Sequence, residues 1–220
     1  MAWSALVALV LRRAGCAYCG TPPRGRGAVV ELAAIALAIW LWDRSPTALT
    51  LAQGLVVAVA FLLITVIDLE HRLILHAVSI PSMIAVALLH ALDPSRGLVK
   101  TLAGGAFGFA LVFIMFLLGG LFAKGVARLR KRSLDEVAFG FGDVTLATVI
   151  GLAVGWPGVV LALFLGILAA GAFSLVYMVA MLLRRRYTAF TPIPYGPFLI
   201  LGAWVVYFGG RPFLERLAGG

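Results

Sequence analysis

Long apolar runs, separated by short clusters of charge, proline and glycine, fill most of the sequence. A helix needs about 20 apolar residues to cross a hydrocarbon core of ~30 Å, and local thinning of the bilayer accommodates shorter spans. The pattern therefore predicts an all-α fold, a polytopic membrane helix bundle of about seven to eight transmembrane segments. Seven of these segments are expected at residues 28–42, 47–67, 77–92, 98–123, 144–156, 158–183 and 197–208.

The first eleven residues form a shorter apolar stretch. Its nearest basic residues, Arg12 and Arg13, follow the stretch, whereas a secretory signal peptide carries its basic residues in front. We expect a short or partial first span that stays on the protein. The predicted organisation has two parts. Residues 1–27 hold this span and a small cytosolic segment with the two cysteines of a CxxC sequence, and residues 28–220 form the membrane helix bundle.

Composition supports the membrane assignment. Of the 220 residues, 63% are hydrophobic and 12% are charged, whereas a soluble domain is nearer half apolar and a quarter charged. The formal net charge is +9. In a membrane protein this excess indicates orientation and contact with anionic lipid. Membrane lipids are therefore expected partners, and nucleic acid is not, because no soluble module remains to carry a basic face.

The basic residues also predict which way the bundle faces. Thirteen of the 18 lysines and arginines fall on one side of the predicted spans, and the side richer in basic residues should be cytoplasmic. Asp68, at the end of one span, and Asp143, at the start of another, then share that cytoplasmic face. Glu31 and the loop 191–197 fall there too.

These two aspartates are the strongest candidates for chemistry, because acids at a membrane edge are costly and often functional. Either one alone could be an interfacial anchor or a helix N-cap. Two carboxylates held close together share a proton, so that one can activate water while the other protonates a leaving amine. That chemistry is peptide hydrolysis. The neighbouring Gly140 and Gly142 would let the backbone bend and let another chain approach closely.

Other polar residues have simpler interpretations. Glu70 lies two residues from Asp68, so on a helix it points elsewhere and is expected to be a headgroup-level charge. The isolated His76 and His90, near span ends, are expected to be polar anchors. The two cysteines, Cys16 and Cys19, form a lone CxxC, whereas structural zinc needs four ligands, so bound zinc is possible but not expected.

At these residues the chain resembles the type IV prepilin peptidases, membrane aspartic proteases of the GxGD type. Gly140-Phe141-Gly142-Asp143 is similar to the family signature, residues 67–74 to the segment around its first aspartate, and residues 192–199 to its proline-rich loop. Cys16 and Cys19 resemble the start of its cytosolic insert. The resemblance covers about residues 16–204. Many members have proline where Leu75 stands and lysine where Thr145 stands.

The resemblance implies an aspartic endopeptidase at the cytoplasmic face of the bacterial inner membrane, removing short basic leaders from prepilins or pseudopilins. Proteolysis would need no cofactor. S-adenosylmethionine would be needed only for N-methyltransferase activity, which the reduced insert leaves open. Two alternatives stay open, a proton-coupled transporter with an aspartate relay and a catalytically silent relative with a scaffold role. The implied catalytic residues are Asp68 and Asp143, and the implied flexible, substrate-binding walls are Gly140, Gly142, Pro194, Tyr195, Gly196 and Pro197.

Overall fold

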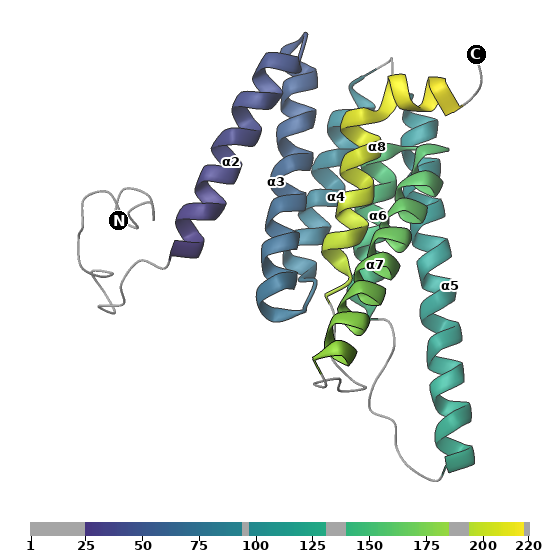
Figure 1. Cartoon of the computed structure of the whole chain (residues 1–220). Helices are drawn as coiled ribbons and strands as arrows, with labels where there is room; N and C mark the ends of the chain where they lie inside the picture. The colour runs from purple at the N-terminus through teal and green to yellow at the C-terminus, as the bar shows by residue number, and fades with distance from the viewer. Residues whose placement is uncertain (1–24, 94–96, 131–139, 185–193, 218–220) are drawn as a thin grey trace, which may run out of the picture. The chain divides into compact units, whose positions relative to one another are not determined.

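The computed structural model describes residues 25–93, 97–130, 140–184 and 194–217, and over these residues it is all-helical. All seven predicted segments are confirmed as helices (Figure 1). Most ends differ by a few residues, but the helices predicted to end at residues 123 and 208 continue to Arg130 and Leu217. The shorter stretch at residues 1–11, predicted as a first span, lies outside the described residues. The helices are α2 (Gly25–Arg44), α3 (Ala48–His71), α4 (His76–Ala91), α5 (Leu98–Arg130), α6 (Phe141–Val154), α7 (Gly158–Leu183) and α8 (Gly196–Leu217).

Several of these helices match the dimensions of a bilayer. Three stretches are long and apolar enough to cross it, namely Ala48–His71, Leu98–Phe122 and Gly158–Leu183. Shorter apolar helices are found at His76–Ala91, Phe141–Val154 and Gly196–Gly209. The predicted all-α fold is therefore confirmed over the described residues, and the membrane bundle of seven to eight spans stays a prediction that these apolar helices support.

The chain forms two compact units, Met1–Leu62 and Leu63–Gly220. In the first, Thr47 and Thr50 cap the start of α3, because the amide of each donates to the hydroxyl of the other. Leu41 of α2 packs over Gly54 of α3. The predicted division into residues 1–27 and 28–220 is a different one, and it stays a prediction.

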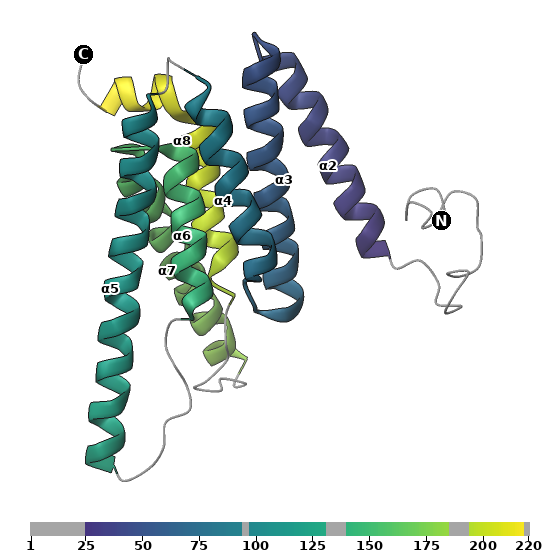
Figure 2. The same cartoon turned by 180° about the vertical axis from the view of Figure 1, so that it is seen from behind.

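In the second unit, α6 is the central helix. It contacts α4, α5, α7 and α8, and both views place it among them (Figure 2). A helix that is apolar on all sides is typical of a buried position. Accordingly, five of its side chains have no exposed surface at all: Val144, Leu146, Ala147, Val149 and Ile150.

Small residues bring α6 close to α5. A side chain at Gly104 of α5 would overlap the carbonyl oxygen of Gly151, and one at Gly108 would overlap the carbonyl oxygen of Ala147. Membrane helices use such glycines to bring their backbones into direct contact. The α7–α8 pair packs in the same way at Gly202, which lies against Ala162. The helix that carries Asp143, α6, is thus held close to α5, and α8 is held close to α7.

Candidate active site

Asp68 lies in the last turn of α3 and is buried, with 5% of its surface exposed. Its Oδ2 accepts a hydrogen bond of 3.0 Å from the backbone amide of Gly196, the first residue of α8. A Cβ at position 196 would lie only 2.6 Å from that same oxygen. Only glycine therefore fits beside the carboxylate as it stands.

Asp143 is the third residue of α6 and is half-buried. Its Oδ2 accepts a 3.0 Å hydrogen bond from the amide of Gly140, and its own amide donates to the Gly140 carbonyl at 3.1 Å. This reciprocal arrangement is the backbone pattern of a capping box. Gly140 itself occupies the N-cap position, so the interpretation of Asp143 as the N-cap is wrong, although the carboxylate does satisfy an amide at the start of the helix.

The structure brings the two aspartates together, within electrostatic reach of one another. Gly196, which binds Asp68, also lies against Leu146, one turn after Asp143 on α6. The end of α3 and the starts of α6 and α8 meet at the lower end of the second unit in Figure 1. Among the residues that the structure describes, the Oδ1 atoms of the two carboxylates have no hydrogen-bond partner in the protein, so each could face water or substrate.

The connection from α3 to α4 closes onto the start of α6. Arg72 has a positive φ of 54°, which ends α3 and turns the chain. A Cβ at Gly142 would lie 2.8 Å from Cβ and 3.2 Å from the carbonyl oxygen of Ile74 in this connection. The predicted close approach of another chain segment is therefore confirmed at Gly142. At Gly140 the nearest atoms would be 3.9 Å away, so that position is open.

Tyr195 immediately precedes α8 and is half-buried. Burial raises the pKa of its phenol, and the negative charge of Asp143 raises this pKa further. The hydroxyl therefore keeps its proton in the neutral range and lies where it feels the charge of Asp143. Pro194 and Pro197, which flank it, are each half-buried. Residues 191–193 of the predicted loop lie outside the described part of the chain.

An aromatic contact that the sequence did not predict lies beside Asp143. The ring of His76, at the start of α4, stacks on Phe141 with centroids 5.5 Å apart, and Phe116 of α5 meets Phe141 edge-on at 6.1 Å. His76 is exposed, as expected of a polar anchor. His90 is not: it is 1% exposed, and its Nδ1 lies 3.1 Å from the carbonyl oxygen of Leu152, so its assignment to the interface is wrong.

The remaining residues that the sequence analysis singled out are Glu70, Thr145, Cys16 and Cys19. Glu70 is exposed beside His71, with 3.9 Å between its Oε2 and Nε2 of the histidine, as expected for a headgroup-level residue. Thr145 is buried, and its hydroxyl donates to the Gly142 carbonyl at 2.8 Å. Cys16 and Cys19 lie outside the described residues. Within the described ranges, no group of three or more histidine, cysteine or acidic side chains could hold a metal ion.

Part of the chain matches a known protein family. Residues 55–175, more than half of the chain and including both aspartates, match the Type IV leader peptidase family. The chain belongs to this family. The matched residues end before Tyr195 and Gly196, so the contribution of α8 to the site is given by the hydrogen bond from Gly196 to Asp68 and not by this family match.

Relatives match over most of this chain. A prepilin leader peptidase/N-methyltransferase of Burkholderia pseudomallei (strain K96243) is 29% identical over 217 residues, 97% of this chain and 64% of the relative. A protein of the same name from Aeromonas hydrophila is 28% identical over 204 residues, 90% of this chain and 63% of the relative. The chain thus spans less than two thirds of these relatives' length. No solved structure matches the chain.

Proposed function

We propose that this member of the Type IV leader peptidase family is a membrane aspartic endopeptidase. The observation that carries the proposal is that two aspartates from different helices lie within electrostatic reach of one another, each with one carboxylate oxygen held by a glycine amide. Backbone amides fix both side chains and leave a second oxygen on each for the reaction. A pair that merely anchored helix ends would not need to converge.

The proposed chemistry uses one proton shared by the pair. The ionised carboxylate takes a proton from water as the water oxygen attacks the scissile carbonyl carbon. The protonated carboxyl group polarises the carbonyl oxygen, and a proton then passes to the leaving nitrogen as the C–N bond breaks. One peptide bond and one water thus give a carboxylic acid and an amine, with the pair returned to its starting protonation.

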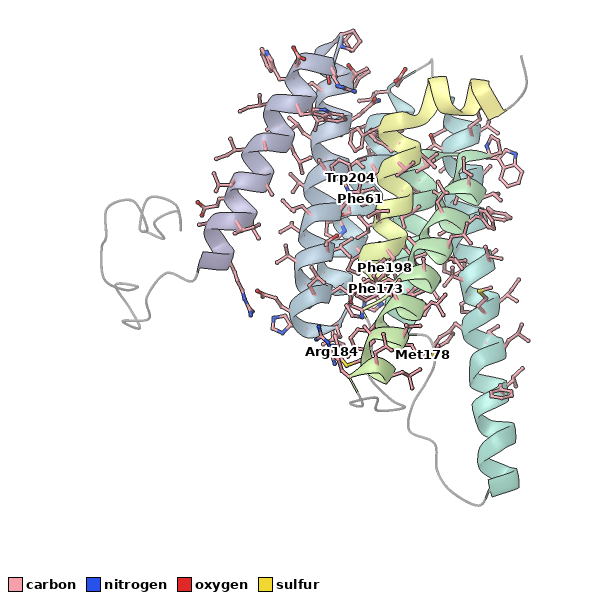
Figure 3. The ribbon with its side chains drawn as sticks, viewed as in Figure 1. Phe61, Phe173, Met178, Arg184, Phe198 and Trp204 are labelled. Carbon is pink, nitrogen blue, oxygen red and sulfur yellow. The ribbon has the colours of Figure 1, made fainter. Side chains whose placement is uncertain are left out.

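The location of the pair suits substrates with a basic leader and an apolar helix. Both aspartates lie in a terminal turn of their helix rather than midway along it, which disfavours the transporter relay. Arg72 follows α3 at this end of the second unit, and Arg184 ends α7 there (Figure 3). Basic residues favour the cytoplasmic side. Prepilins or pseudopilins are therefore the proposed substrates, cut at the cytoplasmic face of a bacterial inner membrane.

No cofactor is proposed for proteolysis. The relatives' names include an N-methyltransferase activity, but this chain spans less than two thirds of the length of the first of them. S-adenosylmethionine therefore enters the proposal only if methylation is found. A bound zinc at Cys16 and Cys19 would be structural, because neither cysteine belongs to the proposed reaction.

The test is leader removal from a co-expressed prepilin. Asp68→Asn and Asp143→Asn should each lower the cleavage rate by on the order of 10²- to 10⁴-fold, because each removes one acid–base group. Both proteins should still accumulate in the membrane. Glu70→Gln is the matched control, since Glu70 is an exposed acid two residues from Asp68, and it should cleave normally. Full cleavage by either asparagine variant would end the proposal, and no cleavage by the unaltered chain would favour the silent relative.

A further inference from the structure

One backbone amide at the start of α8 is available to donate a hydrogen bond to Asp68. The first residues of a helix carry amides with no partner inside the helix. At position 197 this amide is missing, because the residue is proline. The amides of Phe198 and Leu199 both point to the Tyr195 carbonyl, at 3.2 and 3.4 Å. That leaves the Gly196 amide, whose hydrogen goes to Oδ2 of Asp68.

The first turn of α8 is fixed by packing against α7. Phe198 meets Phe173 with ring centroids 5.0 Å apart (Figure 3). A Cβ at Gly166 of α7 would lie 2.7 Å from Cα of Leu199, so the two backbones touch next to this turn. The amide of Gly196 is therefore presented from a rigid element, which is what positioning a reacting group requires.

A side chain at position 196 would displace the carboxylate rather than the helix. The atom nearest to a Cβ there is Oδ2 of Asp68 at 2.6 Å, the end of a side chain, followed by Cγ of Asp68 at 3.2 Å and Cδ2 of Leu146 at 3.5 Å. Leu146 is in ordinary contact. The side chain of Asp68 is therefore the group that must move, and it then leaves its place beside Asp143.

We propose that Gly196 is a positioning residue for Asp68: its amide orients the carboxylate, and its lack of a side chain leaves room for it. The inference rests on the proposed endopeptidase function. It assigns the start of α8 to the catalytic machinery, as the element that fixes one half of the aspartate pair. Gly196 acts through Asp68 and does not itself touch the reacting atoms.

The test compares Gly196→Ala with Gly171→Ala in purified protein, using a prepilin as substrate. Gly171 lies on α7, and a Cβ there would meet nothing within 4 Å, so this control makes the same chemical change without a contact. Gly196→Ala should lower kcat by roughly 10- to 100-fold, because a 1 Å misplacement of a reacting group costs that much. KM should stay within about twofold, since substrate binding is not the property that is lost.

The pH–rate profile separates positioning from a general structural effect. Alanine keeps the backbone amide, but its Cβ displaces the Asp68 carboxylate and so breaks the hydrogen bond from that amide. The ionised Asp68 then loses stabilisation, so the acidic limb of the Gly196→Ala profile should move to higher pH. Gly171→Ala should keep the unaltered profile. Thermal unfolding in detergent should be similar for both variants.

Two results would overturn the inference while the proposed function stands. One is wild-type kcat and pH profile in Gly196→Ala. The other is loss of the Gly196→Ala protein from the membrane, which would make the residue structural. Failure of the function itself is recognised separately, because neither the unaltered chain nor Gly171→Ala would then cleave, and the inference would fall with it.

Discussion

Both aspartates accept a hydrogen bond from a glycine amide, but one glycine is close in the sequence and the other is distant. Oδ2 of Asp143 is bound by the amide of Gly140, three residues earlier on the same helix start. Oδ2 of Asp68 is bound by the amide of Gly196, 128 residues later. The first anchor forms whenever α6 forms, whereas the second exists only after α8 has docked. Asp68 should therefore be the half of the site that depends on tertiary packing.

Lengthening each aspartate by one methylene should give the largest difference. Asp143→Glu keeps the local anchor, because glutamate is the usual residue at this position of a capping box. Asp68 is buried and its carboxylate already lies against Gly196, so Asp68→Glu should overpack the site and lower the stability by about 1–3 kcal/mol. Thermal unfolding in detergent measures this. Equal stabilities for the two variants would contradict the proposed asymmetry, whatever their cleavage rates.

A smaller effect is expected from the two glycines of the Gly140-Phe141-Gly142-Asp143 sequence. At Gly142 a methyl group would meet Cβ and the backbone of Ile74, so alanine must move the connection after α3 relative to α6. We expect roughly tenfold slower cleavage from this displacement. Gly140 has extended dihedrals, φ −83° and ψ 155°, and open space around a Cβ, so Gly140→Ala should cost less than about threefold.

If Gly140→Ala proves as damaging as Gly142→Ala, close packing on Ile74 is not the reason that glycine stands at position 142. Both variants are to be assayed for cleavage at matched amounts of membrane protein.

Tyr195 offers a spectroscopic way to compare the two aspartates. Burial, and then the charge of Asp143, raise its pKa above 10.0, and Asp68 is not among the causes. Asp143→Asn should therefore lower the pKa of Tyr195 relative to the unaltered chain, and Asp68→Asn should leave it in place. Tyrosinate absorbance followed against pH, with Tyr195→Phe subtracted to remove the other four tyrosines, measures this pKa. An equal fall in both asparagine variants would show that Tyr195 does not distinguish the two acids.

The raised pKa of Tyr195 also predicts that the stability of the fold falls at alkaline pH. The folded protein holds the phenolic proton more tightly than the unfolded chain, so this stabilisation is complete below pH 10 and is lost as pH rises through the higher folded pKa. Tyr195→Phe should flatten this fall. Unfolding followed from pH 9 upward would test it, and an unchanged slope in Tyr195→Phe would contradict it.

The smallest effect concerns the threonine beside Asp143. Thr145 and Thr148 each donate a hydroxyl hydrogen bond to an earlier carbonyl on α6, to Gly142 at 2.8 Å and to Val144 at 2.7 Å. Valine at either position should cost about 1 kcal/mol of stability. Cleavage should fall a few-fold only in Thr145→Val, because its bond ends on the residue before Asp143. Equal cleavage in the two variants would contradict that local role.

Much of this architecture was predictable because its causes are local or repeat along the chain. The spacing of charge, proline and glycine predicted all seven described helices, since apolar length and chain breakers act over a few residues. Asp68 and Asp143 stood out as single acids beside long apolar runs. His90 shows the limit of such reasoning, because its position near a span end looked interfacial until Leu152 was found against it.

The sequence by itself determined the helices and their apolar character, and also the anchor of Asp143, because a capping hydrogen bond spans only three residues. Tertiary structure alone decided that the amide of Gly196 reaches Asp68, that Ile74 covers Gly142 and that His90 is buried. The physical reason is that helix formation depends on neighbours along the chain, whereas these contacts depend on which helix faces pack together. The glycines of α5 and α6 permit that packing, but no local sequence pattern specifies which neighbouring helix each glycine will contact.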